Sequence, residues 1–225
     1  MISALIVQTF AWFGAMGLAL FVAAGTFTWP FAWIFLVQTI VICVAGGLWF
    51  ARHDPSLLRE RLAPLIQKEQ PTADKILLSI FVMVFFAAPV LMGLDAVRFG
   101  WSSMPPLGRA IGELALLLSI WIGFRTMQEN TFAAPVIKVQ GDRGQRVIAS
   151  GPYRVVRHPM YVATIGFFFG TSLLLGSWWG LAAVFLLLVL FGIRIHVEER
   201  ILRVGLAGYD DYTANVRYRL IPLIW

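Results

Sequence analysis

The chain has 225 residues, of which 59% are hydrophobic and only 13% are charged. A soluble domain carries about a quarter charged residues, so the composition excludes an ordinary soluble protein and indicates an integral membrane protein of one domain. The net charge of +6 comes from cations that cluster between apolar runs, which argues against nucleic-acid binding.

Four apolar runs in the first half of the chain are near the length needed to cross a bilayer. We expect membrane-spanning helices at about Ala4–Ala24, Phe31–Phe50, Ile76–Leu94 (with a kink at Pro89) and Leu107–Phe124. Glu113 lies early in the fourth of these and should be interfacial or face protein. The charged loop Arg52–Lys75 has leucines at helical spacing, so part of it should lie along the membrane surface.

The last apolar region, Met160–Ile195, is too long for one crossing. The segment Gly176–Gly180 interrupts it, so we expect two antiparallel helices of roughly 17 residues each, just long enough to span a bilayer. Tryptophans gather at membrane interfaces, and Trp178 with Trp179 would mark the far side. We therefore predict an all-α, polytopic membrane helical bundle with five to six transmembrane helices, a C-terminal helical hairpin and a cytoplasmic cap.

The distribution of cations predicts the orientation. The loops Arg52–Lys75 and Arg125–Arg157 and the C-terminal tail hold nearly all the Lys and Arg, whereas the opposite loops hold only Arg98 and Arg109. The positive-inside rule then places both termini and both long loops in the cytoplasm. An inner membrane of bacterial type fits this arrangement.

Turn formers, cations and aromatic hydroxyls crowd into Ser150–Tyr161, directly before an apolar helix. Gly151 and Pro152 mark a turn, and a second proline suits the first position of the helix, where its missing N–H costs nothing. Arg157 and His158 therefore sit at a helix N-terminus, whose free N–H groups and positive dipole end suit a carboxylate or a phosphate. The alternative is a cationic membrane-boundary segment anchored by a tyrosine.

A hairpin that turns near Trp178 brings residues equidistant from the turn to the same membrane depth. His158 precedes the turn by as many residues as Glu198 follows it, so the helix start should meet the pair Glu198 and Glu199. Arg194 lies one turn from Glu198 on the same face, and charges at the membrane boundary are functional candidates. Cations facing carboxylates suit a zwitterion, but these opposite charges could equally pair with one another.

Several of these motifs together resemble the isoprenylcysteine carboxyl methyltransferase family, and more loosely the membrane phospholipid N-methyltransferases. The resemblance is specific from about Ala149 to Ile224 and mostly one of hydropathy before that. One departure is Ala163, where the family often has a glycine that allows close helix approach. The matching residues are Gly151-Pro152-Tyr153, Arg157-His158-Pro159-Met160-Tyr161, Glu198-Glu199, Leu202, Tyr209, Tyr212 and Arg219-Leu220-Ile221-Pro222; Asp54-Pro55 with Arg59-Glu60-Arg61 is similar to bacterial members.

The resemblance implies an all-helical membrane enzyme that binds S-adenosylmethionine at the cytoplasmic face, beneath a C-terminal cap, while a lipophilic acceptor enters from the bilayer. Residues 1–225 would form a single membrane domain, in which 1–127 supply the N-terminal transmembrane helices and 128–225 the cofactor-binding, catalytic part. The chain has no glycine-rich loop after a strand, so a Rossmann-type cofactor site is excluded. The cofactor-binding residues expected are Gly151, Pro152, Tyr153, Arg157, His158, Tyr161, Glu198 and Glu199.

Within this site we expect Arg157 and His158 to hold the cofactor carboxylate and Glu198 to hold its ammonium or ribose. Tyr153 and Tyr161 would pack around the cofactor. Arg194 and Glu198 are the expected catalytic residues. Arg194 would face the acceptor, and Glu198 or Glu199 would act as base only if the acceptor is an amine. The histidines lack the grouping of metal ligands, so no metal is expected.

The reaction implied by the resemblance is carboxyl O-methylation of an isoprenylcysteine-like lipid. N-methylation of a phospholipid amine and S-methylation of a small thiol are the alternatives, and the sequence leaves the acceptor and the oligomeric state open. The expected partners are a lipophilic substrate and the lipid membrane, without nucleic acid. A small membrane transporter, with Glu113, Arg125 and Arg194 lining a pore, is the rival from another class, although no inverted repeat is visible. A purely structural membrane partner is a third interpretation.

Overall fold

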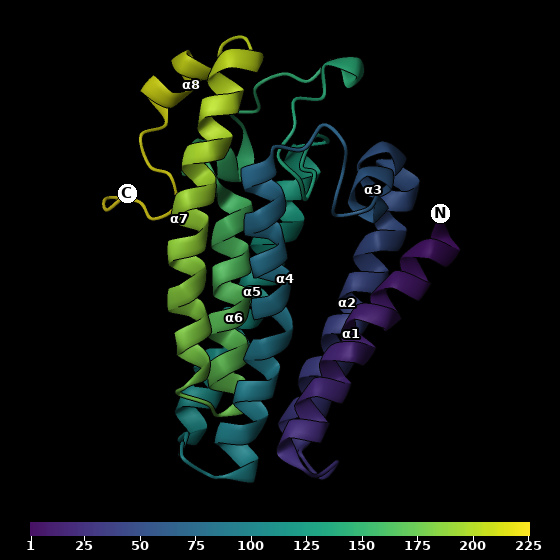
Figure 1. Ribbon diagram of the computed structural model, residues 1–225, viewed down its shortest axis with the longest axis vertical. Helices are drawn as coiled ribbons and strands as arrows, with labels where there is room; N and C mark the ends of the chain where they lie inside the picture. The colour runs from purple at the N-terminus through teal and green to yellow at the C-terminus, as the bar shows by residue number, and fades with distance from the viewer.

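The computed structural model describes all 225 residues as helices and connecting loops, without strands (Figure 1). Five helices are long and apolar enough to span a membrane, and a sixth apolar helix, α6 (Pro159–Leu175), is shorter. The predicted all-α membrane bundle is thus confirmed. The five long helices are α1 (Ile2–Ala24), α2 (Pro30–His53), α4 (Thr72–Gly93, continued by a π-helical turn at Leu94–Arg98), α5 (Pro106–Glu129) and α7 (Gly180–Gly205).

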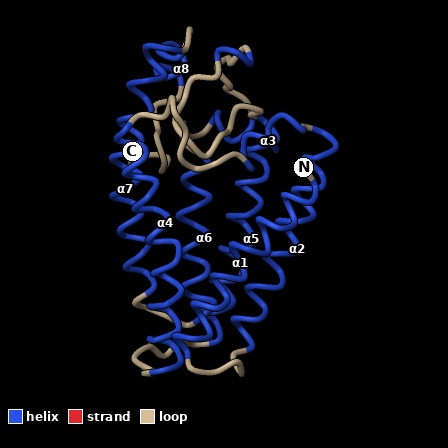
Figure 2. The backbone as a smooth tube through the Cα atoms, turned by 45° about the vertical axis from the view of Figure 1, so that its right-hand side comes forward, coloured by secondary structure: helices blue, strands red, loops and turns tan.

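Two short helices, α3 (Pro55–Leu62) and α8 (Tyr209–Asn215), lie with the long loops at one end of the molecule (Figures 1 and 2). α3 confirms that part of the charged loop is helical. Its buried Leu57 and Leu58 pack against Leu5 of α1 and Phe50 of α2. This small apolar cluster fixes α3 beside the N-terminus of α1.

The last apolar region forms the predicted hairpin of two antiparallel helices. α6 ends at Leu175, where Gly176 adopts a left-handed conformation with φ of 88° that closes the helix. The prediction of two equally short helices was wrong for α7, which continues past Ile195 to Gly205. α5 likewise ends at Glu129 instead of Phe124. In both cases the extension contains Arg and Glu, which lower hydropathy but favour helix.

The turn of the hairpin is tied to the end of α4 by a buried carboxylate. Asp95 Oδ2 accepts hydrogen bonds from the Oγ atoms of Ser102 and Ser177, both at 2.6 Å, and from the Trp179 N–H at 3.2 Å. Trp178 and Trp179 are themselves exposed, as expected for side chains at a membrane interface.

α1 and α2 lean away from the bundle of α4 to α7 at the end that carries α3 and α8, and they converge on it at the other end (Figure 1). The main core reflects this arrangement. Its members from α1 and α2 come from the convergent halves, with Met16 and Leu20 on α1 and Phe35 on α2. Glu113 faces protein, because it accepts a 3.0 Å hydrogen bond from Gln38 Nε2 of α2.

α5 and α6 cross at very short range because glycines face each other. A Cβ atom on Gly112 would lie 2.7 Å from Leu173 Cβ and 2.9 Å from the Gly170 carbonyl oxygen, closer than real Cβ contacts. Further along, Gly123 of α5 faces Ala163, and a Cβ on Gly123 would make an ordinary 3.5 Å contact with Ala163 Cβ. The helices therefore stay close at Ala163 because the glycine lies on the opposite helix.

This crossing predicts a steric effect on stability. Gly112→Val should destabilise the protein by roughly 1–3 kcal/mol, because the added side chain meets backbone atoms of α6 that cannot move independently. Thermal unfolding in detergent measures the change. Gly14→Val is the matched control, since nothing lies within 4 Å of a Cβ at Gly14. Equal unfolding temperatures for the two variants would contradict the close crossing.

Candidate active site

The start of α6 is built as the sequence predicts. Residues Gly151–Arg154 form a short 3-10 turn, His158 is the N-cap, and Pro159 occupies the first helical position. The C-terminal tail runs alongside this start. The Arg157 and His158 N–H groups donate to the carbonyl oxygens of Tyr218 and Arg219 at 2.9 and 3.0 Å. The tail therefore lies against the helix start.

The hairpin brings the helix start to the acidic pair of α7. Arg157 Nε lies 2.7 Å from Glu199 Oε1, and His158 Nε2 lies 3.2 Å from the same oxygen. On the other side of its ring, His158 Nδ1 is 3.6 Å from Glu198 Oε2. Equal spacing from the turn thus places cations and carboxylates side by side, as the sequence predicts.

Glu199 is the internal partner of these cations. It also meets Arg219 Nε of the tail at 3.2 Å, and its side chain is only 5% exposed. Arg157 Nη1 also donates hydrogen bonds to the carbonyl oxygens of Val216 and Arg217. The alternative that opposite charges pair with one another therefore holds for Arg157 and Glu199.

Glu198 is placed differently, because it faces a cavity. Its Oε2 atom accepts a hydrogen bond from the Tyr161 hydroxyl at 2.5 Å, and its side chain is 25% exposed. Tyr161 is held in turn between the rings of His158 and Phe191, with centroid distances of 5.5 and 4.6 Å. Glu198 is the only acidic residue that lines the cavity.

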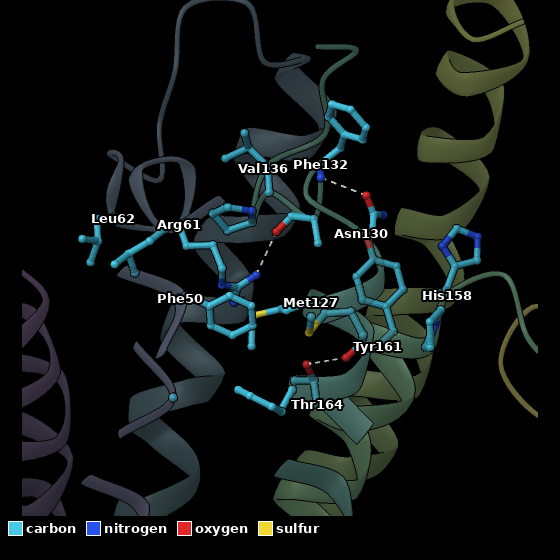
Figure 3. Close-up of a pocket in the computed structure, with 18 of the residues that line it drawn as sticks. Phe50, Arg61, Leu62, Met127, Asn130, Phe132, Val136, His158, Tyr161 and Thr164 are labelled. Atoms are coloured by element: carbon cyan, nitrogen blue, oxygen red, sulfur yellow. Dashed lines mark hydrogen bonds between the residues drawn. The ribbon is translucent and has the colours of Figure 1, made fainter. Parts of the chain in front are cut away.

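The cavity has a volume of about 1070 Å³ and extends between the α1–α2 pair and the bundle (Figure 3). Its two ends differ in character. The polar end includes Tyr153, Arg157, His158, Tyr161, Arg194, Glu198, Tyr209 and Tyr212. The apolar end includes Trp12, Phe13, Ile42, Phe81, Phe85 and Ile120.

Tyrosines of the tail cover the polar end. Tyr209 and Tyr212 of α8 are buried, and Tyr153 packs against them. Tyr212 donates to the Tyr153 carbonyl oxygen at 2.8 Å, and Asn130 Nδ2 donates to the Tyr153 hydroxyl at 2.9 Å. Burial raises the pKa of Tyr153 to about 12 and the pKa values of Tyr209 and Tyr212 above that of a free tyrosine. The three phenols therefore stay neutral at physiological pH and serve as hydrogen-bonding walls.

Gly151 and Pro152 do not line this cavity, in contrast to six other predicted site residues. Gly151 has a φ of 55°, and its Cα faces the side chain of Glu129, where a Cβ atom would collide. Ser150 Oγ donates to Glu129 Oε2 at 2.7 Å beside it. These residues shape the turn that leads into α6 and fix it to the end of α5. Glu199, too, lies outside the cavity lining.

Arg194 lines the cavity but already forms an ion pair with a buried carboxylate. Its Nε atom lies 2.7 Å from Asp74 Oδ1, and its Nη2 atom donates to the Pro135 carbonyl oxygen at 2.7 Å. Asp74 is fully buried and also accepts from Gln70 Nε2 and the Ile137 N–H. The pair joins α4, α7 and the loop after α5. Asp74 was missed in the sequence, where its signal is a lone acid just before an apolar span.

The Asp74–Arg194 pair predicts a large effect on stability. Asp74→Ala should lower the free energy of unfolding by about 3–5 kcal/mol, because it leaves the Arg194 guanidinium buried without its counter-charge. Chemical denaturation in detergent measures this change. Asp142→Asn, at an exposed position, is the control. The double variant Asp74→Leu, Arg194→Met should recover much of the loss, and no recovery would contradict this account.

Comparison with known proteins identifies the region that contains this site. Residues 107–205 match the family model described as phospholipid methyltransferase. The match includes α5, the α6–α7 hairpin and the residues from Arg157 to Glu199, whereas no curated protein matches the chain. Residues 107–205 are therefore a domain of the phospholipid methyltransferase family, within the group that also contains the isoprenylcysteine carboxyl methyltransferases, and the protein is a membrane methyltransferase that uses S-adenosylmethionine.

Proposed function

We propose that the enzyme methylates the headgroup amine of a phospholipid that enters the cavity from the bilayer. The observation that carries this proposal is the cavity itself, which joins a charged end beneath the tail to an apolar end between α1, α2 and the bundle. A lipid has the same division between headgroup and acyl chains. The polar end would receive the cofactor and the headgroup, and the apolar end would receive the chains.

The polar end fits the cofactor by its charges. S-adenosylmethionine supplies an electrophilic methyl group on a sulfonium and also carries an α-carboxylate and an α-ammonium. We assign the carboxylate to His158 and the N-terminus of α6, where the Met160 N–H has no backbone partner and the helix dipole is positive. Glu198 Oε1, which has no hydrogen-bond partner in the protein, would meet the ammonium. Tyr153 and Tyr161 would pack beside it.

Arg157 and Glu199 would then position other residues of the site without contacting the cofactor. Because each already satisfies the other, their contribution is to hold the helix start and the tail in position for the cofactor. Gly151 and Pro152 would contribute the turn that presents Tyr153. On this division, residues 128–225 supply the cofactor end, and the helices within 1–127 supply most of the apolar wall.

Methyl transfer to a nucleophile is an in-line displacement that depends mainly on positioning and exclusion of water. A phospholipid amine must also lose a proton. Of the two carboxylates considered as base, Glu199 is occupied by Arg157, His158 and Arg219. Glu198 faces the cavity, and because its Oε1 atom would lie between the cofactor ammonium and the acceptor amine, it is our candidate for the group that takes the proton.

Carboxyl methylation of an isoprenylcysteine-like lipid is the second candidate. The segment Arg219–Pro222, which resembles that family, lies against the start of α6 as part of the cap. A carboxylate acceptor, however, needs a cation to orient it. Arg194, the residue expected in this role, is already neutralised by Asp74, which favours the amine.

We place the polar end at the cytoplasmic face, as the distribution of Lys and Arg indicates. α3, α8 and the two long loops all lie at this end (Figure 2).

The charge of Glu198 predicts its effect on cofactor binding. Glu198→Gln should weaken S-adenosylmethionine binding about tenfold or more, because a hydrogen bond to a charged group is worth about 1.5–3 kcal/mol. Isothermal titration calorimetry of the detergent-solubilised protein measures the affinity. Glu69→Gln, at an exposed position, should bind like the wild type. An unchanged affinity of Glu198→Gln would refute the cofactor assignment.

The proposed acceptor predicts where label appears. With radiolabelled S-adenosylmethionine, the enzyme should transfer label to short-chain phosphatidylethanolamine, and the label should resist alkaline hydrolysis because an N-methyl bond is stable to base. S-farnesylcysteine would instead give a base-labile methyl ester, and a small thiol would give a thioether. Label on either of these, with none on the phospholipid amine, would reject the proposed acceptor.

A further inference from the structure

The cationic side chains that line the cavity differ in whether they have a carboxylate partner in the protein. Three have carboxylate partners, and a fourth, Arg146, is exposed to solvent at the loop. Arg61 remains as a partly buried cation of the cavity with no carboxylate within 4 Å. The three satisfied pairs are Lys138–Glu60 at 2.6 Å, Arg157–Glu199 at 2.7 Å and Arg194–Asp74 at 2.7 Å.

Arg61 reaches the cavity from the last turn of α3. Its Nη1 atom donates to the Ala133 carbonyl oxygen at 3.0 Å, the only hydrogen bond of its side chain. Figure 3 shows it beside the ring of Phe50 and above the side chain of Met127. A guanidinium has five N–H donors, so most of its donors have no partner in the protein.

Burial makes this arrangement unfavourable by itself. It lowers the pKa of Arg61, although an arginine keeps its proton in proteins. A buried charge without a counter-charge is destabilising. Its neighbour Glu60 does not supply one, because Glu60 pairs with Lys138. An anion that enters the cavity would remove this cost.

We propose that Arg61 binds the phosphate of the acceptor phospholipid. This inference rests on the proposed function and specifies the headgroup that the enzyme selects. A phosphodiester offers two oxygens that match the planar fork of a guanidinium. α3 lies at the end of the bundle that also carries α8 (Figure 1), which we place at the membrane boundary, where lipid phosphates lie.

The position of Arg61 relative to Glu198 fits a phosphoethanolamine headgroup. In that headgroup the phosphate and the amine are separated by two carbons, so a cation and a carboxylate must meet different parts of it. Arg61 comes from the α2–α3 side of the cavity and Glu198 from α7. Both residues line the same cavity, as does Tyr153.

The experiment measures lipid binding and catalysis separately on the full-length enzyme in detergent. The variants are Arg61→Gln, which removes the charge, and Arg61→Lys, which keeps the charge but loses the fork. Arg59→Gln is the matched control, since Arg59 is exposed on the same helix and does not line the cavity. The probes are dioctanoyl phosphatidylethanolamine and dioctanoylglycerol, which lacks the phosphate, and calorimetry with S-adenosylmethionine tests the fold.

Arg61→Gln should bind the phospholipid about tenfold or more weakly and raise its KM similarly, as the loss of charge-assisted hydrogen bonds requires. Arg61→Lys should give an intermediate loss. Binding of dioctanoylglycerol and of S-adenosylmethionine should not change, and Arg59→Gln should resemble the wild type.

Wild-type phospholipid affinity in Arg61→Gln would overturn the inference, as would an equal loss of affinity for dioctanoylglycerol. If Arg61→Gln fails to fold, as judged by lost cofactor binding, Arg61→Lys decides: an unchanged phospholipid affinity there overturns the bidentate contact. If the wild type binds phospholipid through Arg61 but methylates none, the proposed function fails while this inference stands.

Discussion

The buried carboxylate of Glu199 is the interaction on which the polar end of the molecule depends. From α7, it contacts Arg157 and His158 at the start of α6 and Arg219 of the tail. Removing one member of a buried ion pair typically lowers the free energy of unfolding by about 3–5 kcal/mol, because it leaves the other charge uncompensated. Separating these segments would therefore be unfavourable. One side chain thus closes the hairpin and fixes the tail over it, while its neighbour Glu198 is left to face the cavity.

Pairing of charges separates the scaffold from the residues that can act on a ligand. Arg194 and Asp74 satisfy each other between α7 and α4, and this pair fixes the loop after α5 through Pro135. Once such pairs are set aside, the cavity keeps one carboxylate, Glu198, and one partly buried cation without a carboxylate, Arg61. A zwitterionic headgroup needs these two charges, and they come from opposite walls.

The sequence predicted the features that depend on local pattern or symmetry. The length of the apolar runs predicted the membrane-spanning helices, and the Gly-Ser-Trp-Trp-Gly segment predicted the hairpin. Equal spacing from the turn of this hairpin predicted that His158 lies beside the acidic pair. The sequence could not predict which charged side chains form ion pairs, because the two members of a pair meet only through the packing of helices that are distant along the chain. Asp74 and Arg194 are 120 residues apart, and periodicity does not specify that α4 and α7 face each other there. The isolation of Arg61 depends likewise on the pairing of Glu60 with Lys138.

The apolar end of the cavity follows from how α1 and α2 are held. They pack on the bundle through Met16, Leu20 and Phe35 at one end, and the cluster of Leu5, Phe50, Leu57 and Leu58 ties α3 to them at the other. The stretch between has no such cluster and lines the cavity together with Leu5, Phe50 and Leu58. In water an apolar gap of this size would tend to collapse, but in a bilayer lipid chains are as apolar as the side chains and give no drive to close it. The bilayer therefore gives no hydrophobic drive to close the space that we propose for an acyl chain.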